Sequence, residues 1–360
     1  MKRLFNYLLL CTVTALLFTA CSKDDDGPDL PVSDEISGFY FFNYGGSSQG
    51  TVTKYDYNKD SVVNYYYEAQ NGVELNSNIQ YAYEYNDKIY LMGNGVDQVI
   101  VVGHDFVQTG EGISDSIISP RYCIANGDYL YISCWGGDVW NDESVSYIAK
   151  MNIKTQTVEK KIRIAGGPEG LAIANGNLYA ALNYKDSVAV TSLSNNAVSY
   201  IATPAVTSYF VKDKNDNLYV SLLSTYNDYS SSTGLGYINT SNNTLQATYA
   251  LGGVSSGYSS ILAPNRDLSV IYVLATSWGE PASIYAFDTT TKEFTPFIEN
   301  LTGTNGMFVD PRDNEDKIYV FGAESYSEPG TVDIYTTEGT YVSQFDCGIS
   351  PYWAIFLKKE

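Results

Sequence analysis

Short apolar stretches alternate with polar turns along almost the whole chain. In the clearest copy, Asn175-Gly176-Asn177-Leu178-Tyr179, an Asn-Gly turn leads into an apolar run that starts with Leu and Tyr. Related copies recur at intervals of 40 to 53 residues, and their tyrosines are Tyr90, Tyr131, Tyr179, Tyr219, Tyr272 and Tyr319. A unit of this length that contains four short strands is typical of one blade of a β-propeller.

Six such units lie between Ile79 and Phe345, and a seventh is divided between the two ends of the chain. Three N-terminal stretches have the alternation of strands, and the C-terminal stretch resembles the first strand of every other unit. These stretches are Gly38–Phe42, Thr51–Tyr55, Val62–Tyr66 and Pro351–Phe356. Pairing the C-terminal strand with the N-terminal ones would close the ring and leave no open edge. The sequence therefore predicts an all-β, seven-bladed β-propeller over residues 38–360.

The unit from Gly166 to Ile201 resembles the YVTN or YncE-like propeller repeat. The match lies in Gly167-Pro168-Glu169-Gly170, in Leu178-Tyr179 and in Val188-Ala189-Val190. The Asp that closes the third strand of that repeat is present at Asp288 and replaced by Ser192. The resemblance extends with variable fidelity over residues 38–360 and implies the fold more than an activity.

The first residues read as a targeting segment. Met1–Ala20 has two basic residues followed by an apolar run that is too short to span a bilayer, as in a signal peptide. The stretch that ends in Cys21 resembles a bacterial lipobox, and residues 22–26 resemble the acidic export signal of Bacteroidetes surface lipoproteins. These resemblances imply a lipid on Cys21 that anchors the protein to the outer face of the outer membrane. Residues 21–37 are expected to be a flexible tether.

Composition narrows the classes of partner and the use of cysteine. Lys and Arg number 21 and Asp and Glu 41, a formal net charge of −20, which argues against nucleic acid or an anionic membrane surface as a partner. Cys123 and Cys134 flank one predicted hairpin turn but fall out of register with each other. We therefore expect two buried, unpaired thiols instead of a disulfide.

Large aromatic residues are concentrated in the loops of one predicted face. This face is formed by the loops that enter each first strand and the loops between second and third strands, and all four Trp fall on or beside it. Exposed aromatic side chains are costly unless they bind something, although some, Trp353 above all, are expected to pack inside the fold. The predicted ligand-binding residues are Trp135, Trp140, Tyr184, Tyr226, Tyr229, Trp278, Tyr326, Tyr122 and Tyr258, with Asp138 and Asp186.

Catalytic chemistry has weaker support in the sequence. His104 is the only His, so a triad or a His-based metal site would depend on one residue in a predicted turn. Paired carboxylates could act in glycoside hydrolysis, but the sequence does not reveal a pair at the required separation. We predict no catalytic residue, no metal and no cofactor.

Among Bacteroidetes surface lipoproteins with such propellers, the chain resembles the vitamin B12-capturing group, BtuG. The likeness lies in the architecture, the lipobox, the export signal and the aromatic, acidic loops. It implies a corrinoid held on the loop face and a TonB-dependent transporter as partner. A carbohydrate ligand, a glycan-active enzyme and a protein-interaction platform are the alternatives, because sugar faces also stack on aromatic rings.

Overall fold

The structure is a computed structural model that describes residues 36–46, 49–224, 232–251, 262–276, 280–310 and 317–358. The predicted signal peptide, Cys21 and nearly all of the tether lie outside these residues. Four predicted ligand-binding residues also lie outside them, namely Tyr226, Tyr229, Tyr258 and Trp278. No helix in the described ranges is long and apolar enough to cross a membrane.

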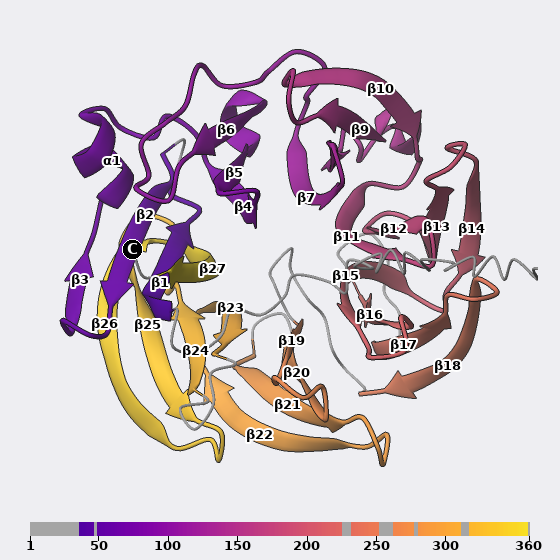
Figure 1. Cartoon of the computed structure of the whole chain (residues 1–360). Helices are drawn as coiled ribbons and strands as arrows, with labels where there is room; N and C mark the ends of the chain where they lie inside the picture. The colour runs from indigo at the N-terminus through magenta and orange to yellow at the C-terminus, as the bar shows by residue number, and fades with distance from the viewer. Residues whose placement is uncertain are drawn as a thin grey trace, which may run out of the picture. The chain divides into compact units, whose positions relative to one another are not determined.

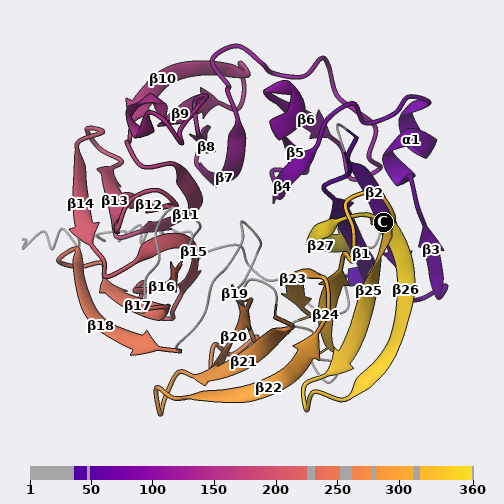
Figure 2. The ribbon, with the colours of Figure 1, turned by 180° about the vertical axis from the view of Figure 1, so that it is seen from behind.

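Among the described residues, seven antiparallel sheets surround a common centre, as Figures 1 and 2 show from opposite sides. Within the same ranges, six sheets have four strands and one has three. In each complete meander the first strand lies nearest the centre and the last lies at the outside (Figure 1). The predicted fold, an all-β propeller of seven blades, is confirmed.

The blades are numbered here from the N-terminus. Blade 1 contains β1 (Ile36–Asn43), β2 (Thr51–Asp56), β3 (Ser61–Val63) and β27 (Pro351–Lys358), and blade 2 contains β4 (Ile79–Tyr85), β5 (Lys88–Gly93) and β6 (Gln98–Val102). Blade 3 contains β7 (Pro120–Asn126), β8 (Tyr129–Cys134), β9 (Tyr147–Asn152) and β10 (Thr157–Arg163), and blade 4 contains β11 (Pro168–Ala174), β12 (Asn177–Leu182), β13 (Ser187–Ser192) and β14 (Val198–Ala202). Blade 5 contains β15 (Val206–Lys212), β16 (Leu218–Leu223), β17 (Gly234–Asn239) and β18 (Thr244–Ala250). Blade 6 contains β19 (Leu262–Pro264), β20 (Val270–Ala275), β21 (Ala282–Asp288) and β22 (Phe294–Leu301), and blade 7 contains β23 (Thr304–Val309), β24 (Lys317–Gly322), β25 (Pro329–Thr336) and β26 (Tyr341–Ile349).

The last strand of the chain closes the ring as predicted. In blade 1, β27 pairs antiparallel with β1, and Phe39 faces Phe356 while Phe41 faces Ala354. Three of these four side chains are buried, so the closing strand contributes to the core as well as to the hydrogen bonding of the sheet. Closure in this way covers the strand edges that an open ring would expose.

Two details of the predicted strand pattern are wrong. The stretch Val62–Tyr66 was expected to be a strand, but β3 ends at Val63, and Tyr65, at φ 57°, precedes the short helix α1 (Tyr66–Asn71). Blade 2 also lacks the expected fourth strand in the described chain, which after β6 makes only isolated bridges such as Val99 to Ile113. The chain turns away there because Phe106, at φ 61°, is buried against Tyr40.

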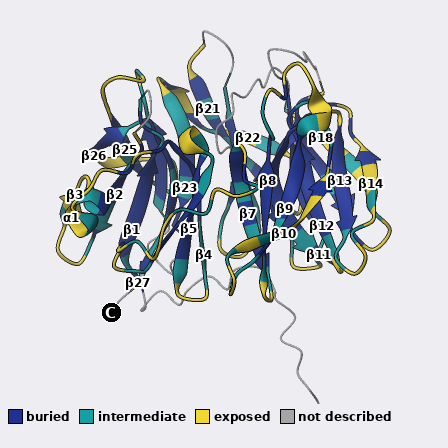
Figure 3. Ribbon diagram, turned by 90° about the horizontal axis from the view of Figure 1, so that it is seen from above, coloured by how far each residue is buried: buried dark blue, intermediate teal, exposed yellow. Residues whose placement is uncertain are grey.

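The core lies between neighbouring blades. Each marker tyrosine of the repeat lies in the second strand of its blade and is at most 5% exposed. Figure 3 shows the strands largely buried and the connecting turns exposed. Cys123 and Cys134 lie in this core as free thiols, and Cys123 faces Ile132 across the hairpin, which confirms the predicted unpaired pair. Each blade therefore buries its apolar residues against the next, so the packing is continuous around the ring.

Candidate functional site

The innermost strands share an irregularity at the end of the propeller where they begin. In β4, β7, β11, β15, β23 and β27, the register with the neighbouring strand shifts at the second to fourth residue. A shift of this kind is a β-bulge, which bends a strand and re-aims the side chain at the bulge. The bulges carry polar residues that we call the polar ring, namely Gln80, Arg121, Glu169, Ser208, Asn305 and Tyr352.

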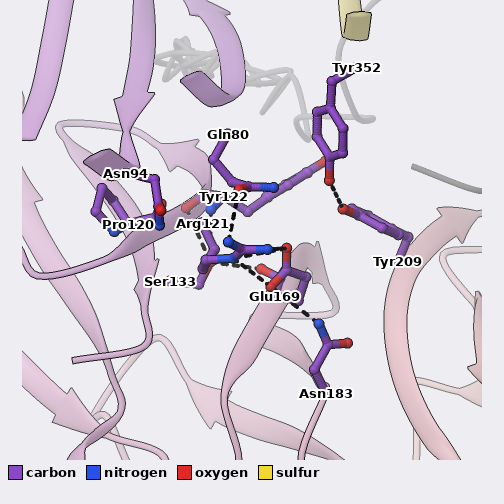
Figure 4. A network of polar contacts seen from close by, with 10 residues as sticks. All are labelled: Gln80, Asn94, Pro120, Arg121, Tyr122, Ser133, Glu169, Asn183, Tyr209 and Tyr352. Atoms are coloured by element: carbon purple, nitrogen blue, oxygen red, sulfur yellow. Dashed lines mark hydrogen bonds and ion pairs between the residues drawn. The ribbon is translucent and has the colours of Figure 1, made fainter. Parts of the chain in front are cut away.

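Arg121 and Glu169 form an ion pair in the polar ring, between blades 3 and 4 (Figure 4). The Arg121 Nε donates to Glu169 Oε2 at 2.9 Å and the Nη2 donates to Oε1 at 2.9 Å. The Nη1 donates to the side-chain oxygen of Gln80 in blade 2 at 2.8 Å. Asn183 Nδ2 donates to Glu169 Oε2 at 3.3 Å, and Ser133 Oγ donates to the Glu169 main-chain oxygen at 2.7 Å. The network thus joins three consecutive blades.

Burial determines the electrostatics of this pair. The side chains of Arg121 and Glu169 are 6% and 1% exposed. Burial alone would lower the pKa of the Arg121 guanidinium, but the Glu169 carboxylate outweighs it and raises that pKa. Burial raises the pKa of Glu169, and the Arg121 charge opposes this rise. Both carboxylate oxygens accept N–H groups of Arg121, which favours a charged pair at neutral pH.

Aromatic side chains fill the centre of the ring beside this pair. The hydroxyl groups of Tyr209 in blade 5 and Tyr352 in blade 1 lie 2.6 Å apart and hydrogen bond across the centre (Figure 4). The Tyr122 ring stacks on Tyr81 at 3.7 Å and lies 6.5 Å from the Trp353 ring. Burial raises the pKa of Tyr122 to about 12, so this phenol is protonated at neutral pH. The centre is therefore a packed, neutral aromatic plug.

Three aromatic side chains stand between the Arg121 network and solvent, and we call them the aromatic rim. They are Trp135 and Trp140, from the loop between β8 and β9, and Tyr184, from the loop between β12 and β13. The guanidinium carbon of Arg121 lies 4.0 Å from the Trp135 ring centre. The Trp135 ring lies edge-on to Trp140 at 5.6 Å and to Tyr184 at 5.4 Å.

Exposure differs sharply within the aromatic rim. Trp135 is 5% exposed, whereas Trp140 is 56% exposed. Trp135 is therefore a packing residue between the network and the surface, and Trp140 is the ring that faces solvent. Gly167 has a role here, because a Cβ at this position would lie 2.5 Å from the Tyr184 ring. A side chain there would displace Tyr184.

The other described candidates are distributed over the same end of the propeller. Asp138 and Asp186 are exposed in the two loops of the aromatic rim, and Asp138 accepts the Asn141 side-chain amide at 2.6 Å. Tyr122 lies in strand β7 and not in a loop, so its ring belongs to the plug. Tyr326 is 73% exposed in the loop between β24 and β25, and its main-chain oxygen lies beside Gly46 of blade 1. The structure thus brings together Trp135, Trp140, Tyr184, Asp138 and Asp186, and leaves Tyr326 apart.

The sequence analysis did not identify Gln80, Arg121 and Glu169. A signal was present, because Pro120-Arg121 and Pro168-Glu169 place a charged residue directly after a proline at the start of a strand. No local pattern shows that two residues 48 positions apart meet in neighbouring blades. The polar ring therefore became visible only from the register of the strands.

One cleft lies at the other end of the strands. It has a volume of about 380 Å³ and is lined by residues of blades 5 and 6, including Asp213, Tyr237 and Lys292. Tyr237 donates to Asp213 Oδ2 at 2.7 Å, and Lys292 Nζ donates to the Tyr219 hydroxyl at 2.6 Å. In the described part of the chain no group of three or more His, Cys, Asp or Glu side chains is arranged to hold a metal ion.

Comparison with known proteins places the chain in a family. A family model described as a domain of unknown function, DUF5074, matches residues 37–348. The chain belongs to the DUF5074 family. No curated protein sequence matches it. The family assignment carries the propeller domain and, by its own description, no activity.

Solved structures with similar folds have varied names. A quinonprotein alcohol dehydrogenase-like protein from Bacteroides thetaiotaomicron is 16% identical, with a TM-score of 0.67 and coverage of 89% of this chain and 78% of that one. The periplasmic gluconolactonase of Pseudomonas aeruginosa is 13% identical, with a TM-score of 0.62 and coverage of 89% and 98%. Hydrazine synthase from Kuenenia stuttgartiensis is also 13% identical, with a TM-score of 0.59 and coverage of 74% and 85%. At these identities the likeness is one of fold alone.

Proposed function

We propose that this protein is a surface-anchored binding protein that captures a small nutrient at the aromatic rim and passes it to a TonB-dependent transporter. The anchor would be a lipid on Cys21, followed by the acidic residues 22–26. The proposed ligand is a corrinoid, whose broad flat ring carries amide groups at its edge. The propeller would act as a rigid support for the loops that bind it.

The observation that carries this proposal is the exposure of Trp140. More than half of this side chain faces solvent, although its edge contacts with Trp135 and Tyr184 hold the ring in one orientation. An exposed Trp that is already immobilised loses little conformational entropy when a ligand stacks on it, and for this reason Trp dominates many binding surfaces. The exposed carboxylates Asp138 and Asp186 lie in the same two loops and offer acceptors for amide N–H groups.

The decisive experiment is a calorimetric titration of residues 22–360 with cyanocobalamin. One-to-one binding is expected, and Trp140→Ala should weaken it by tenfold to a hundredfold, or about 1.4 to 3 kcal/mol. Tyr341→Ala is the matched control, because Tyr341 is 50% exposed on the outer strand β26 and should leave the affinity unchanged.

Two outcomes would contradict the proposal. The absence of heat at any accessible cyanocobalamin concentration would exclude a corrinoid ligand, and a screen of glycans, the competing class that stacks on aromatic rings, would follow. Binding that survives Trp140→Ala unchanged would place the ligand away from the aromatic rim. The anchor has a separate test, since Cys21→Ala should release the protein from membranes into the soluble fraction.

A further inference from the structure

The ion pair of the polar ring has unused hydrogen-bonding capacity. Arg121 donates through Nε, Nη1 and Nη2 to Glu169 and Gln80, and one N–H on each terminal nitrogen has no acceptor among the described residues. Of the two charged partners, only Arg121 retains measurable exposure, at 6% against 1% for Glu169. A group that approaches the pair from solvent therefore meets guanidinium N–H donors and not the carboxylate.

These donors lie in a surrounding without net charge. Glu169 contacts Arg121 through two N–H···O bonds of 2.9 Å and cancels its charge at longer range. The remaining polar ring residues, Gln80, Ser208, Asn305 and Tyr352, are neutral side chains. At the aromatic rim, Asp138 and Asp186 are exposed and add negative charge. An anion would lose its hydration here without a compensating net attraction.

We propose that the polar ring binds an uncharged carboxamide group of the ligand through the free N–H groups of Arg121, and that Glu169 determines this preference by neutralising Arg121. The carboxamide oxygen accepts from Arg121 and brings no charge that Glu169 would repel. Glu169 is then a specificity-determining residue that the ligand does not touch. This inference deepens the proposed function and rests on it for the identity of the whole ligand, but the preference for amide over carboxylate can be measured with fragments alone.

Acetamide and acetate are suitable probes because they differ almost only in the exchange of a neutral amide for a charged carboxylate. Residues 22–360 contain only four arginines, Arg121, Arg163, Arg266 and Arg312, so the Nε–H resonance of Arg121 can be assigned with the Arg121→Lys variant. Titration of the ¹⁵N-labelled protein then follows Arg121 directly, and the exposed Arg163 serves as an internal control.

In the wild-type protein acetamide should shift the Arg121 resonance with roughly tenfold higher apparent affinity than acetate. In Glu169→Gln, which keeps a hydrogen-bond acceptor but removes the charge, the order should reverse, because Arg121 then carries an uncompensated positive charge. Asp128→Asn is the matched control. It also removes one negative charge, from the exposed pair with Lys154, and should keep the wild-type order.

Acetate binding as tight as acetamide binding in the wild-type protein would overturn the proposal, and so would the absence of any response at Arg121 to either probe. The wild-type comparison decides the question even if Glu169→Gln fails to fold. The result is also separable from the capture proposal. Amide preference without cyanocobalamin binding would leave the polar ring as an amide site for another ligand, whereas cyanocobalamin binding without amide preference would refute the role of Arg121 alone.

Discussion

Removal of one partner of the buried Arg121–Glu169 pair should destabilise the propeller far more than removal of both. Glu169→Ala leaves a guanidinium that is 6% exposed with Gln80 as its only printed side-chain acceptor. An uncompensated buried charge of this kind costs about 3–5 kcal/mol. The same charge in Arg121→Met, Glu169→Met is absent, and methionines of similar volume fill the space. We expect the double variant to lose clearly less than the sum of the two single losses.

The assay is equilibrium urea unfolding of residues 22–360. Tryptophan fluorescence and far-ultraviolet circular dichroism should give coincident transitions, which establishes two-state behaviour before a free energy of unfolding is extracted. The four proteins of the cycle are the wild type, Glu169→Met, Arg121→Met and the double variant. The coupling between the two sites should amount to several kcal/mol, at the upper end of what contacting residues show.

Additive losses would refute this reasoning. Strict additivity would mean that the two side chains stabilise the fold independently, and hence that the bonds from Arg121 to Glu169 do not govern the stability of the ring centre. A loss below about 1 kcal/mol in Glu169→Ala would have the same consequence, because a charge left unpaired in a buried position cannot be that inexpensive.

Three further predictions concern the rest of the propeller. Deletion of Pro351–Lys358 removes the closing strand and should abolish cooperative unfolding measured by circular dichroism, whereas deletion of the final two residues alone should not. Burial raises the pKa of Cys134 to about 12 and that of Cys123 and Cys347 well above the ordinary range, so a disulfide reagent at pH 8 should leave the native protein unlabelled and label three thiols after denaturation; labelling of the native protein would contradict the observed burial. The main-chain N–H groups of two threonines in the β21–β22 turn lower the pKa of Asp288, so its stabilising effect is complete above the ordinary pKa of the group and is lost as the pH falls through the lowered value. Acid unfolding curves should therefore be less steep for Asp288→Asn than for the wild type, and identical curves would exclude this contribution.

The blade repeat could be predicted from the sequence because its signals are local. An Asn-Gly turn followed by an apolar run with Tyr specifies a hairpin wherever it occurs, and the regular spacing of Tyr90, Tyr131 and Tyr179 counts the blades. The closing strand Pro351–Phe356 was predictable for the same reason, since it repeats the pattern of the other first strands. The exposed Trp140 was also within reach, because a Gly-rich loop carries it.

Other features required the tertiary structure because they depend on register and on partners in different blades. The missing fourth strand of blade 2 follows from the burial of Phe106 against Tyr40, which lies in another blade. Trp135 reads in the sequence like Trp140, yet the former is buried because the Arg121 guanidinium covers its ring. A one-residue bulge decides whether Arg121 faces a neighbouring sheet or the centre of the ring. The repeat thus determined the propeller, whereas the long-range pairing of Arg121 with Glu169 and the bulges that permit it determined the candidate site.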